Sequence, residues 1–186
     1  ITGKIIAGYQ WSGDAVYIMQ QAEANDVELN FAIPEECTNM YFDGWAMLKS
    51  GINGNSEKKK AAEAFVNFVS MPENAVRNMY YIGYTSVISG GQSPVIYDYL
   101  KWNYGLESLM EEDDTISEAD AIDYSLGYFF SGVSNDSRYI LRTSKAQTEG
   151  MLSAQYPTEE VMHRSAIMQY FDNDETARIN QMWINV

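Results

Sequence analysis

Short apolar runs alternate with a helical pattern in the first forty residues. Residues 4–9, KIIAGY, are typical of a buried strand, and residues 27–34, VELNFAIP, predict a second strand. Between them, residues 12–23 have the spacing of a helix, with Ser12 as a candidate N-cap. This strand–helix–strand order predicts an α/β layer.

A third strand and two helices are predicted next. Residues 40–48, MYFDGWAML, form an apolar and aromatic run. Ser56 precedes a helix over 57–70, and a further helix is predicted over 72–82 between an initial proline and a terminal glycine. The apolar face of the first helix consists of Ala61, Ala64, Phe65 and Phe68.

The second half of the chain has weaker patterns. Residues 111–120, EEDDTISEAD, predict a solvated acidic loop, whereas 124–132 and 138–144 fit strands or an irregular hairpin. Helices are predicted at 95–105, 158–171 and 173–186. Because both ends of the sequence fall inside predicted elements, we expect the chain to be a portion of a longer protein.

The charge of the chain restricts its partners. Its 186 residues include 26 Asp and Glu against 12 Lys and Arg, which gives a formal net charge of −14. Such an excess argues against nucleic acid as a partner. It fits cationic ligands, and it fits equally a surface that is acidic only for solubility.

Metal and cofactor chemistry have little support in the sequence. The chain has one cysteine, Cys37, and one histidine, His163, which leaves no disulfide and no Cys/His zinc site. The run at 111–114, EEDD, lacks the alternating oxygen spacing of a calcium loop. No phosphate-binding loop, dinucleotide fingerprint or hydrolase motif is present, so we expect no cofactor and no catalysis.

Asp43 stands out because it interrupts an apolar run. No Lys, Arg or His lies between Lys4 and Lys49 to pair with it locally. On a strand, Tyr41 and Asp43 would face the same side, and a carboxylate beside an aromatic ring suits an organic ammonium. The alternative is that Asp43 begins a turn with Gly44 and caps a backbone NH.

Three other side chains are candidates for the same site. Trp11 follows a predicted strand and precedes a predicted helix, which is where α/β folds bind ligands. Tyr84 follows the glycine that ends a helix, and would project from a loop. Each could instead be a packing residue, and Asp14 could serve only the helix dipole. Asp14 and Asp43 together would also suit a glycosidase.

Four segments carry a family resemblance. The segments WSGDA, IPEECTNMYFDGWAML, KKKAAEAFVNFVSMPENAVRNMYYIGYTS and YPTEEV resemble the C-terminal portion of bacterial spermidine/putrescine-binding proteins, the receptors of polyamine ABC importers. The resemblance covers residues 1–88 and about 155–186. The stretch between them matches poorly and is interpreted as an elaboration.

The resemblance implies a fold and a domain organisation. The fold class would be α/β, a periplasmic-binding-protein-like two-lobed fold of type II, here an incomplete C-terminal portion. Residues 1–40 and 90–186 would form the second lobe, and residues 41–89 would be a crossover segment of the first lobe. An incomplete lobe would leave apolar surface exposed, which makes dimerisation a further expectation.

The resemblance also implies a function and a ligand set. The chain would capture a polyamine for ABC permease subunits, in the periplasm or another extracytoplasmic place, associated with the membrane through a lipid anchor or a permease fusion. A sugar or a cationic amino acid is the alternative ligand. Position by position, the implied ligand-binding residues are Trp11, Tyr41 (often Trp in the family), Asp43, Tyr84, Asp14 and Gln169.

Overall fold

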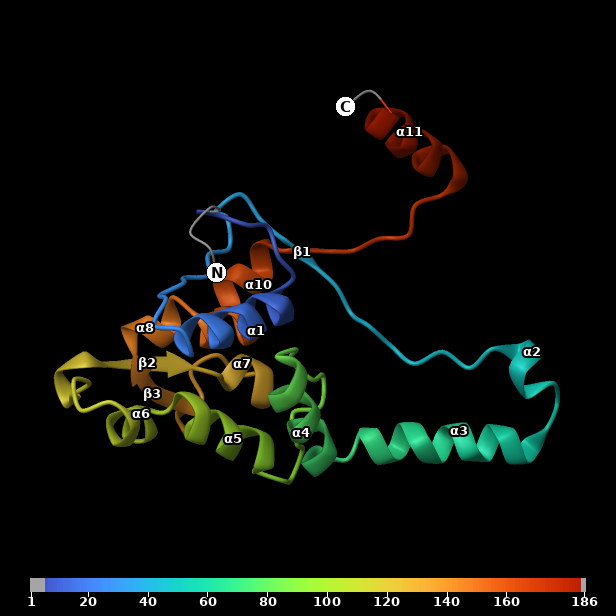
Figure 1. Ribbon diagram of the computed structural model, residues 1–186. Coiled ribbons are helices and arrows are strands. Elements are labelled where there is room, and N and C mark those ends of the chain that lie inside the picture. Colours follow the sequence, from blue (N-terminus) through green and yellow to red (C-terminus); the bar gives the residue numbers. More distant parts are fainter. Residues whose placement is uncertain (1–5, 185–186) are drawn as a thin grey trace.

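The computed structural model describes residues 6–184 and shows a packed body with two extensions (Figure 1). The α-helices are α1 (Ser12–Glu23), α2 (Lys49–Ile52), α3 (Ser56–Val69), α4 (Pro72–Ile82), α5 (Val95–Tyr104), α6 (Leu106–Glu112), α7 (Gly127–Phe130), α8 (Lys145–Thr148), α9 (Met151–Gln155), α10 (Glu159–Arg164) and α11 (Asn173–Ile184). The strands are β1 (Asn39–Met40), β2 (Ala121–Ser125), β3 (Ile140–Ser144) and β4 (Ala166–Ile167), and the 3₁₀ helices are Glu118–Asp120 and Ser137–Tyr139. The described chain is therefore mixed helix and sheet.

The body, residues 12–23 and 72–165, contains the hydrophobic core. Helix α5 shows why it forms, because Ile96, Leu100 and Tyr104 follow one another at four-residue intervals and all are fully buried. Helix α1 and helix α4 contribute further apolar side chains to the same core. The buried residues shared by these elements include Val16, Met19, Ala75, Met79, Leu126, Leu141, Leu152 and Tyr156.

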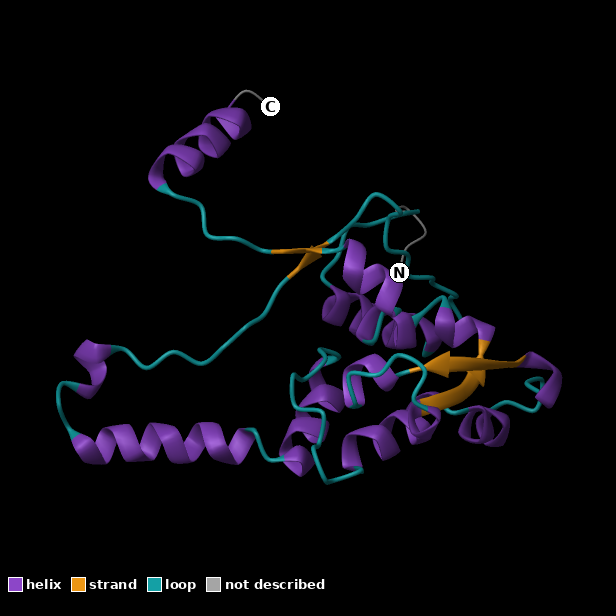
Figure 2. Ribbon diagram, turned by 180° about the vertical axis from the view of Figure 1, so that it is seen from behind, coloured by secondary structure: helices purple, strands orange, loops and turns teal. Residues whose placement is uncertain are grey.

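Strands β2 and β3 form an antiparallel pair in the body (Figure 2). Ala121 pairs with Ser144 at one end and Ser125 with Ile140 at the other. The predicted hairpin is confirmed for 140–144, but the other strand begins earlier than expected and ends at Ser125. Residues 127–130 instead form the short helix α7, and its first residue, Gly127, lies so close to the carbonyl of Val133 that a Cβ would overlap it.

A second, parallel pair of strands joins the segment before residues 41–71 to the segment before α11. Asn39 pairs with Ala166 and Met40 with Ile167. The amide of Ala166 donates to the carbonyl of Thr38 at 2.9 Å, and the amide of Met168 donates to Met40 at 2.8 Å. The predicted helix over 158–171 is therefore wrong beyond Arg164, because the chain leaves the helix to pair with β1.

Three predicted strands are wrong over the residues described. Residues 6–9, 27–34 and 41–48 have no strand neighbour and form irregular or extended chain; residues 4 and 5 lie outside the described range. The amide of Phe31 donates to the carbonyl of Glu149 at 3.0 Å, so this segment is held to the body through a loop contact. Apolar runs marked these segments, but a strand also needs a partner.

Helix ends follow their sequence signals with small shifts. Helix α4 begins at Pro72 and ends at Gly83, whose φ of 75° is the left-handed conformation that favours glycine. Thr158 caps α10 as predicted. Helix α3 is capped by Asn55 rather than Ser56, because the Asn55 side chain accepts from the amides of Glu57 and Lys58.

The arm, residues 41–71, projects from the body and carries α2 and α3 (Figures 1 and 2). None of its residues is buried. Helix α4 lies in the segment predicted to belong to a first lobe, yet it buries Ala75 and Met79 in the same core as α5. The two-lobe organisation stays a prediction. Among residues 6–184, no helix combines the length and apolarity that a membrane crossing requires.

Candidate functional site

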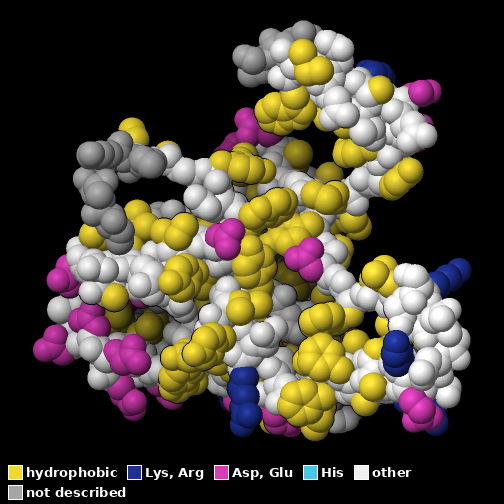
Figure 3. Space-filling model, turned by 45° about the vertical axis from the view of Figure 1, so that its right-hand side comes forward, with side chains coloured by type: hydrophobic (Ala, Val, Ile, Leu, Met, Phe, Trp, Pro, Cys, Tyr) yellow, Lys and Arg dark blue, Asp and Glu magenta, His cyan; other side chains and the backbone are white. Residues whose placement is uncertain are grey.

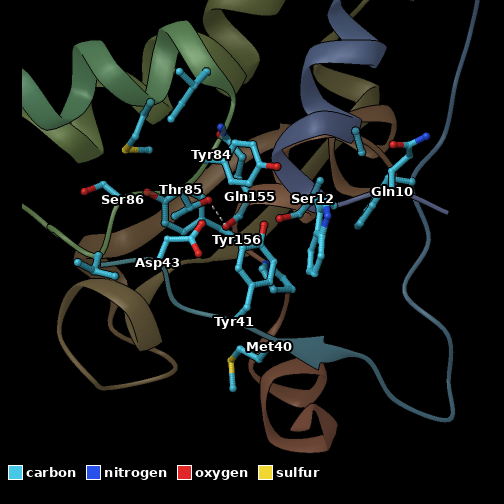
Figure 4. A pocket seen from close by; sticks show the side chains of 18 of the residues that line it. Gln10, Ser12, Met40, Tyr41, Asp43, Tyr84, Thr85, Ser86, Gln155 and Tyr156 are labelled. Carbon is cyan, nitrogen blue, oxygen red and sulfur yellow. Dashed lines mark hydrogen bonds between the residues drawn. The ribbon is translucent and has the colours of Figure 1, made fainter. Parts of the chain in front are cut away.

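Aromatic side chains and one carboxylate surround a hollow of about 510 Å³ at the N-terminal end of α1. Figure 4 shows Tyr41, Asp43 and Tyr84 gathered around one space. The lining consists of Trp11, Met40, Tyr41, Phe42, Asp43, Tyr84, Ile167 and Met168. Its side chains thus come from four separate segments of the chain, brought together beside the β1–β4 pair.

Two glycines bring Tyr84 to the end of α1. Gly83 ends α4 in the left-handed conformation, and a Cβ placed there would lie 2.8 Å from the carbonyl oxygen of Gly13. A Cβ on Gly13 would in turn overlap the ring of Tyr84. The α4 end and the α1 start therefore approach closely only because both positions lack side chains.

Trp11 and Tyr41 form one wall of the hollow. Their ring centroids lie 4.6 Å apart with an interplanar angle of 72°, an edge-to-face arrangement. Trp11 has extended backbone angles and immediately precedes the first turn of α1. About half of the Trp11 side chain remains exposed. The wall is therefore not fully buried in the core, and part of its aromatic surface is accessible to a guest.

Asp43 borders the hollow without a partner of its own chain. Within residues 6–184, no Lys, Arg or His forms an ion pair with it, and its carboxylate accepts no hydrogen bond. The alternative in which Asp43 caps a turn with Gly44 is wrong, because residues 43 and 44 form no turn. No basic side chain lines the hollow either. The negative charge is available to an incoming cation.

Tyr84 remains protonated at ordinary pH. Partial burial raises its pKa to about 12, and the neighbouring Tyr41 and the Asp14 carboxylate add to the increase. Asp14 lies beside the Tyr84 hydroxyl, but it is exposed and does not line the hollow. Tyr84 therefore supplies a neutral ring and a hydroxyl, while Asp14 adds a second negative charge at the edge of the site.

Gln169 lies apart from these residues. It is exposed on the segment between β4 and α11 and lines neither hollow. The glutamine that supports the site is Gln155, which is buried at the end of α9. Its Nε2 donates to the carbonyl of Gly83 at 2.8 Å, and its Oε1 accepts from the Tyr104 hydroxyl at 2.8 Å.

Gln155 fixes the loop that carries Tyr84. Besides its side-chain bonds, its backbone carbonyl accepts from the Thr85 hydroxyl at 2.7 Å (Figure 4). These bonds satisfy a buried amide and attach residues 83–85 to the core. No sequence pattern marks Gln155, because its partners are 51 to 72 residues away along the chain.

A larger hollow of about 1880 Å³ lies between the arm and the body and shares Tyr41, Asp43 and Tyr84 with the smaller one. It is too large for a small guest alone, because pockets for small molecules typically measure about 300–1,000 Å³. Its arm side includes Trp45, Phe65 and Phe68.

The residues set aside in the sequence line neither hollow. His163 is exposed on α10 and lies 3.8 Å from a Glu159 oxygen. Cys37 is exposed. In the acidic run, the Asp113 carboxylate accepts from the backbone amide and the hydroxyl of Thr115, and these hydrogen bonds lower the pKa of Asp113. The described residues contain no group of three or more potential metal ligands.

No family model matches the sequence, and no solved structure matches the chain.

Proposed function

We propose that the chain binds a polyamine, spermidine or putrescine, through an ammonium group held between Asp43 and the rings of Trp11, Tyr41 and Tyr84. The observation that carries this proposal is the Asp43 carboxylate, which faces an aromatic hollow and has no cationic partner among residues 6–184. A guest that brings its own positive charge completes the site.

The physical chemistry of the site favours an ammonium over a neutral guest. A cation on the face of an aromatic ring gains roughly 0.5–2 kcal/mol, and the gain increases as water is excluded. The carboxylate adds a charge-assisted hydrogen bond. A short diamine is too hydrophilic to be held by burial alone, so the charge pair supplies specificity and the rings exclude water around it.

The proposed biological role is that of the solute-binding component of an ABC importer, delivering the polyamine to permease subunits outside the cytoplasm. The segments that resemble polyamine receptors support this role, and they include every ring of the site and Asp43. The net charge of −14 also suits a cationic guest.

Calorimetric titration with putrescine and spermidine tests the proposal. Asp43→Asn keeps the shape of the side chain and removes its charge, so we expect at least a tenfold loss of affinity, about 1.4 kcal/mol. Asp114→Asn is the matched control, because this exposed carboxylate lies in the loop after α6, far along the chain from the hollow. Equal affinity in wild type and Asp43→Asn would falsify the assigned role of Asp43.

A ligand panel separates polyamines from the alternative guests. Thermal shifts are measured with putrescine, spermidine, arginine and neutral sugars at equal concentrations. The proposal predicts stabilisation by the amines that depends on Asp43. Stabilisation by a neutral sugar that Asp43→Asn leaves unchanged would favour a sugar receptor instead.

A further inference from the structure

The arm has an apolar face that the body of the same chain leaves exposed. Phe65 and Phe68 lie on the apolar face of α3 and are 50% and 59% exposed. Trp45 packs on Phe65 at 5.2 Å between ring centroids and is itself 69% exposed. Figure 3 shows such hydrophobic side chains along the arm and on the neighbouring face of the body.

The total exposed area of the chain is larger than that of a compact protein of the same mass. The chain exposes 13605 Å². A compact protein of this mass exposes about 9,000 Å², which leaves an excess of about 4,500 Å². A stable interface between two proteins buries about 800 Å² on each partner. The excess is therefore several times larger than a dimer interface requires.

The hollow beside the arm has apolar walls on both sides. Tyr81, Ile82 and Val87 line it from the body and are all exposed, opposite Phe65 and Phe68 on the arm. A helix with an apolar face could occupy this space and be covered on two sides. The arm of another molecule is such a helix.

The charges of the arm and of the rest of the chain are complementary. Residues 42–71 contain four lysines, Lys49 and Lys58–Lys60, and three carboxylates. The remaining residues contain the other eight basic side chains and 23 of the 26 acidic ones. A weakly basic arm is thus attracted to an acidic body, and a further copy of this chain would supply such a body.

We infer that two copies of this chain associate through their arms, each α3 entering the hollow between the arm and the body of the other copy. The arrangement has a two-fold axis, so that both copies use the same surfaces and no arm is left uncovered. Phe65 and Phe68 provide the apolar contact, and Lys58–Lys60 face the acidic surface of the other copy. This inference goes beyond polyamine binding, and the hollow that α3 enters shares Tyr41, Asp43 and Tyr84 with the proposed binding site.

Sedimentation velocity over a range of concentrations tests the inference. Wild type is expected to sediment with about twice the mass of one chain. The double variant Phe65→Ser/Phe68→Ser should weaken association on the order of 10–100-fold, because it removes two buried rings from each half of the interface. The variant Lys58→Glu/Lys59→Glu/Lys60→Glu should weaken it as well, since it reverses the charge of the arm.

Val133→Ser is the matched control, because Val133 is 58% exposed on a loop of the body that does not line the hollow. It should leave the dimer unchanged. Circular dichroism checks that every variant keeps the helical content of the body. A wild-type chain that stays monomeric at all concentrations overturns the inference, as does a Phe65→Ser/Phe68→Ser variant that dimerises as tightly as wild type.

Discussion

Helices α3 and α4 are consecutive, and both follow clear local signals, yet only one of them is packed. Helix α4 buries Ala75 and Met79 in the body. Helix α3 has an apolar face of the predicted kind and buries no residue. The difference teaches that sequence pattern determines where a helix forms and which face is apolar, whereas burial depends on what the rest of the chain brings to that face.

The same contrast sets the expected stability of the two regions. Fully buried side chains such as Leu100 and Tyr104 connect several elements of the body, so the body should unfold as one unit. The arm is held by few contacts: a cap, exposed ion pairs, two aromatic contacts and a hydrogen bond from the Asn74 side chain to the carbonyl of Phe68. It should therefore open locally at low cost.

Alkaline pH should have the largest effect on the difference in stability between the body and the arm. Burial raises the pKa of Tyr99 and Tyr124 to about 12, and it also raises the pKa of Tyr104 and Tyr156. Tyrosines in the unfolded state ionise near pH 10, so above about pH 10 the unfolded state holds fewer protons and the free energy of unfolding falls with increasing pH.

We expect the body to unfold cooperatively as the pH rises through this window. Far-ultraviolet circular dichroism and tyrosinate absorbance, recorded together, measure the transition. Residues 42–71, which include both helices of the arm, contain no tyrosine and therefore do not contribute to the transition. Complete tyrosine ionisation near pH 10 with the body still folded would contradict the burial of these side chains.

Truncation of one apolar side chain in each region compares their packing. Leu100→Ala, at a fully buried position, should lower the free energy of unfolding by about 2–5 kcal/mol. Phe65→Ala should cost about 1 kcal/mol or less in dilute solution, because the ring is half exposed. Urea denaturation of both variants measures the two costs, and equal losses would remove the distinction between body and arm.

Removal of one buried hydroxyl tests the support beneath the candidate site. Tyr104→Phe leaves the Oε1 of Gln155 without its donor and should cost about 1–3 kcal/mol. Tyr80→Phe is the matched control, since the Tyr80 side chain is exposed. Urea midpoints provide the measurement, and a Tyr104→Phe variant as stable as the control would show that Gln155 finds another donor.

Loss of the cap of α3 should have a small effect, and it should be confined to the arm. Asn55→Ala removes the acceptor for the amides of Glu57 and Lys58 and should destabilise α3 by about 0.5–2 kcal/mol. Hydrogen exchange should become faster over residues 56–69, with no change in α5. Faster exchange in neither helix would contradict the prediction, and so would faster exchange in both, because only a local response fits an independent arm.

Local signals predicted much of the secondary structure, and non-local pairing explains most of the errors. The helices over 72–82 and 95–104 follow from proline, glycine and apolar spacing within a few residues. The segment 27–34 has equally apolar character, but it finds no neighbouring strand and remains irregular. A strand depends on a partner that may lie anywhere in the chain, so its sequence alone is insufficient.

The sequence predicted those residues of the candidate site whose side chains are aromatic or charged. Trp11, Tyr41, Asp43 and Tyr84 border one hollow, although they come from three segments. Their roles in binding stay predictions. Gln169 was named instead of Gln155, because the buried amide is recognised only through its contacts with Gly83 and Tyr104, which no linear pattern reveals.

The short parallel ladder between β1 and β4 has a mechanical consequence. Tyr41 directly follows β1, and Met168, which directly follows β4, borders the same hollow. Asp43 follows closely after a strand that is joined to the segment leading to α11 by two backbone hydrogen bonds. The ladder thus holds the segment that carries Asp43 beside the segment that leads to α11, at a place outside the hydrophobic core.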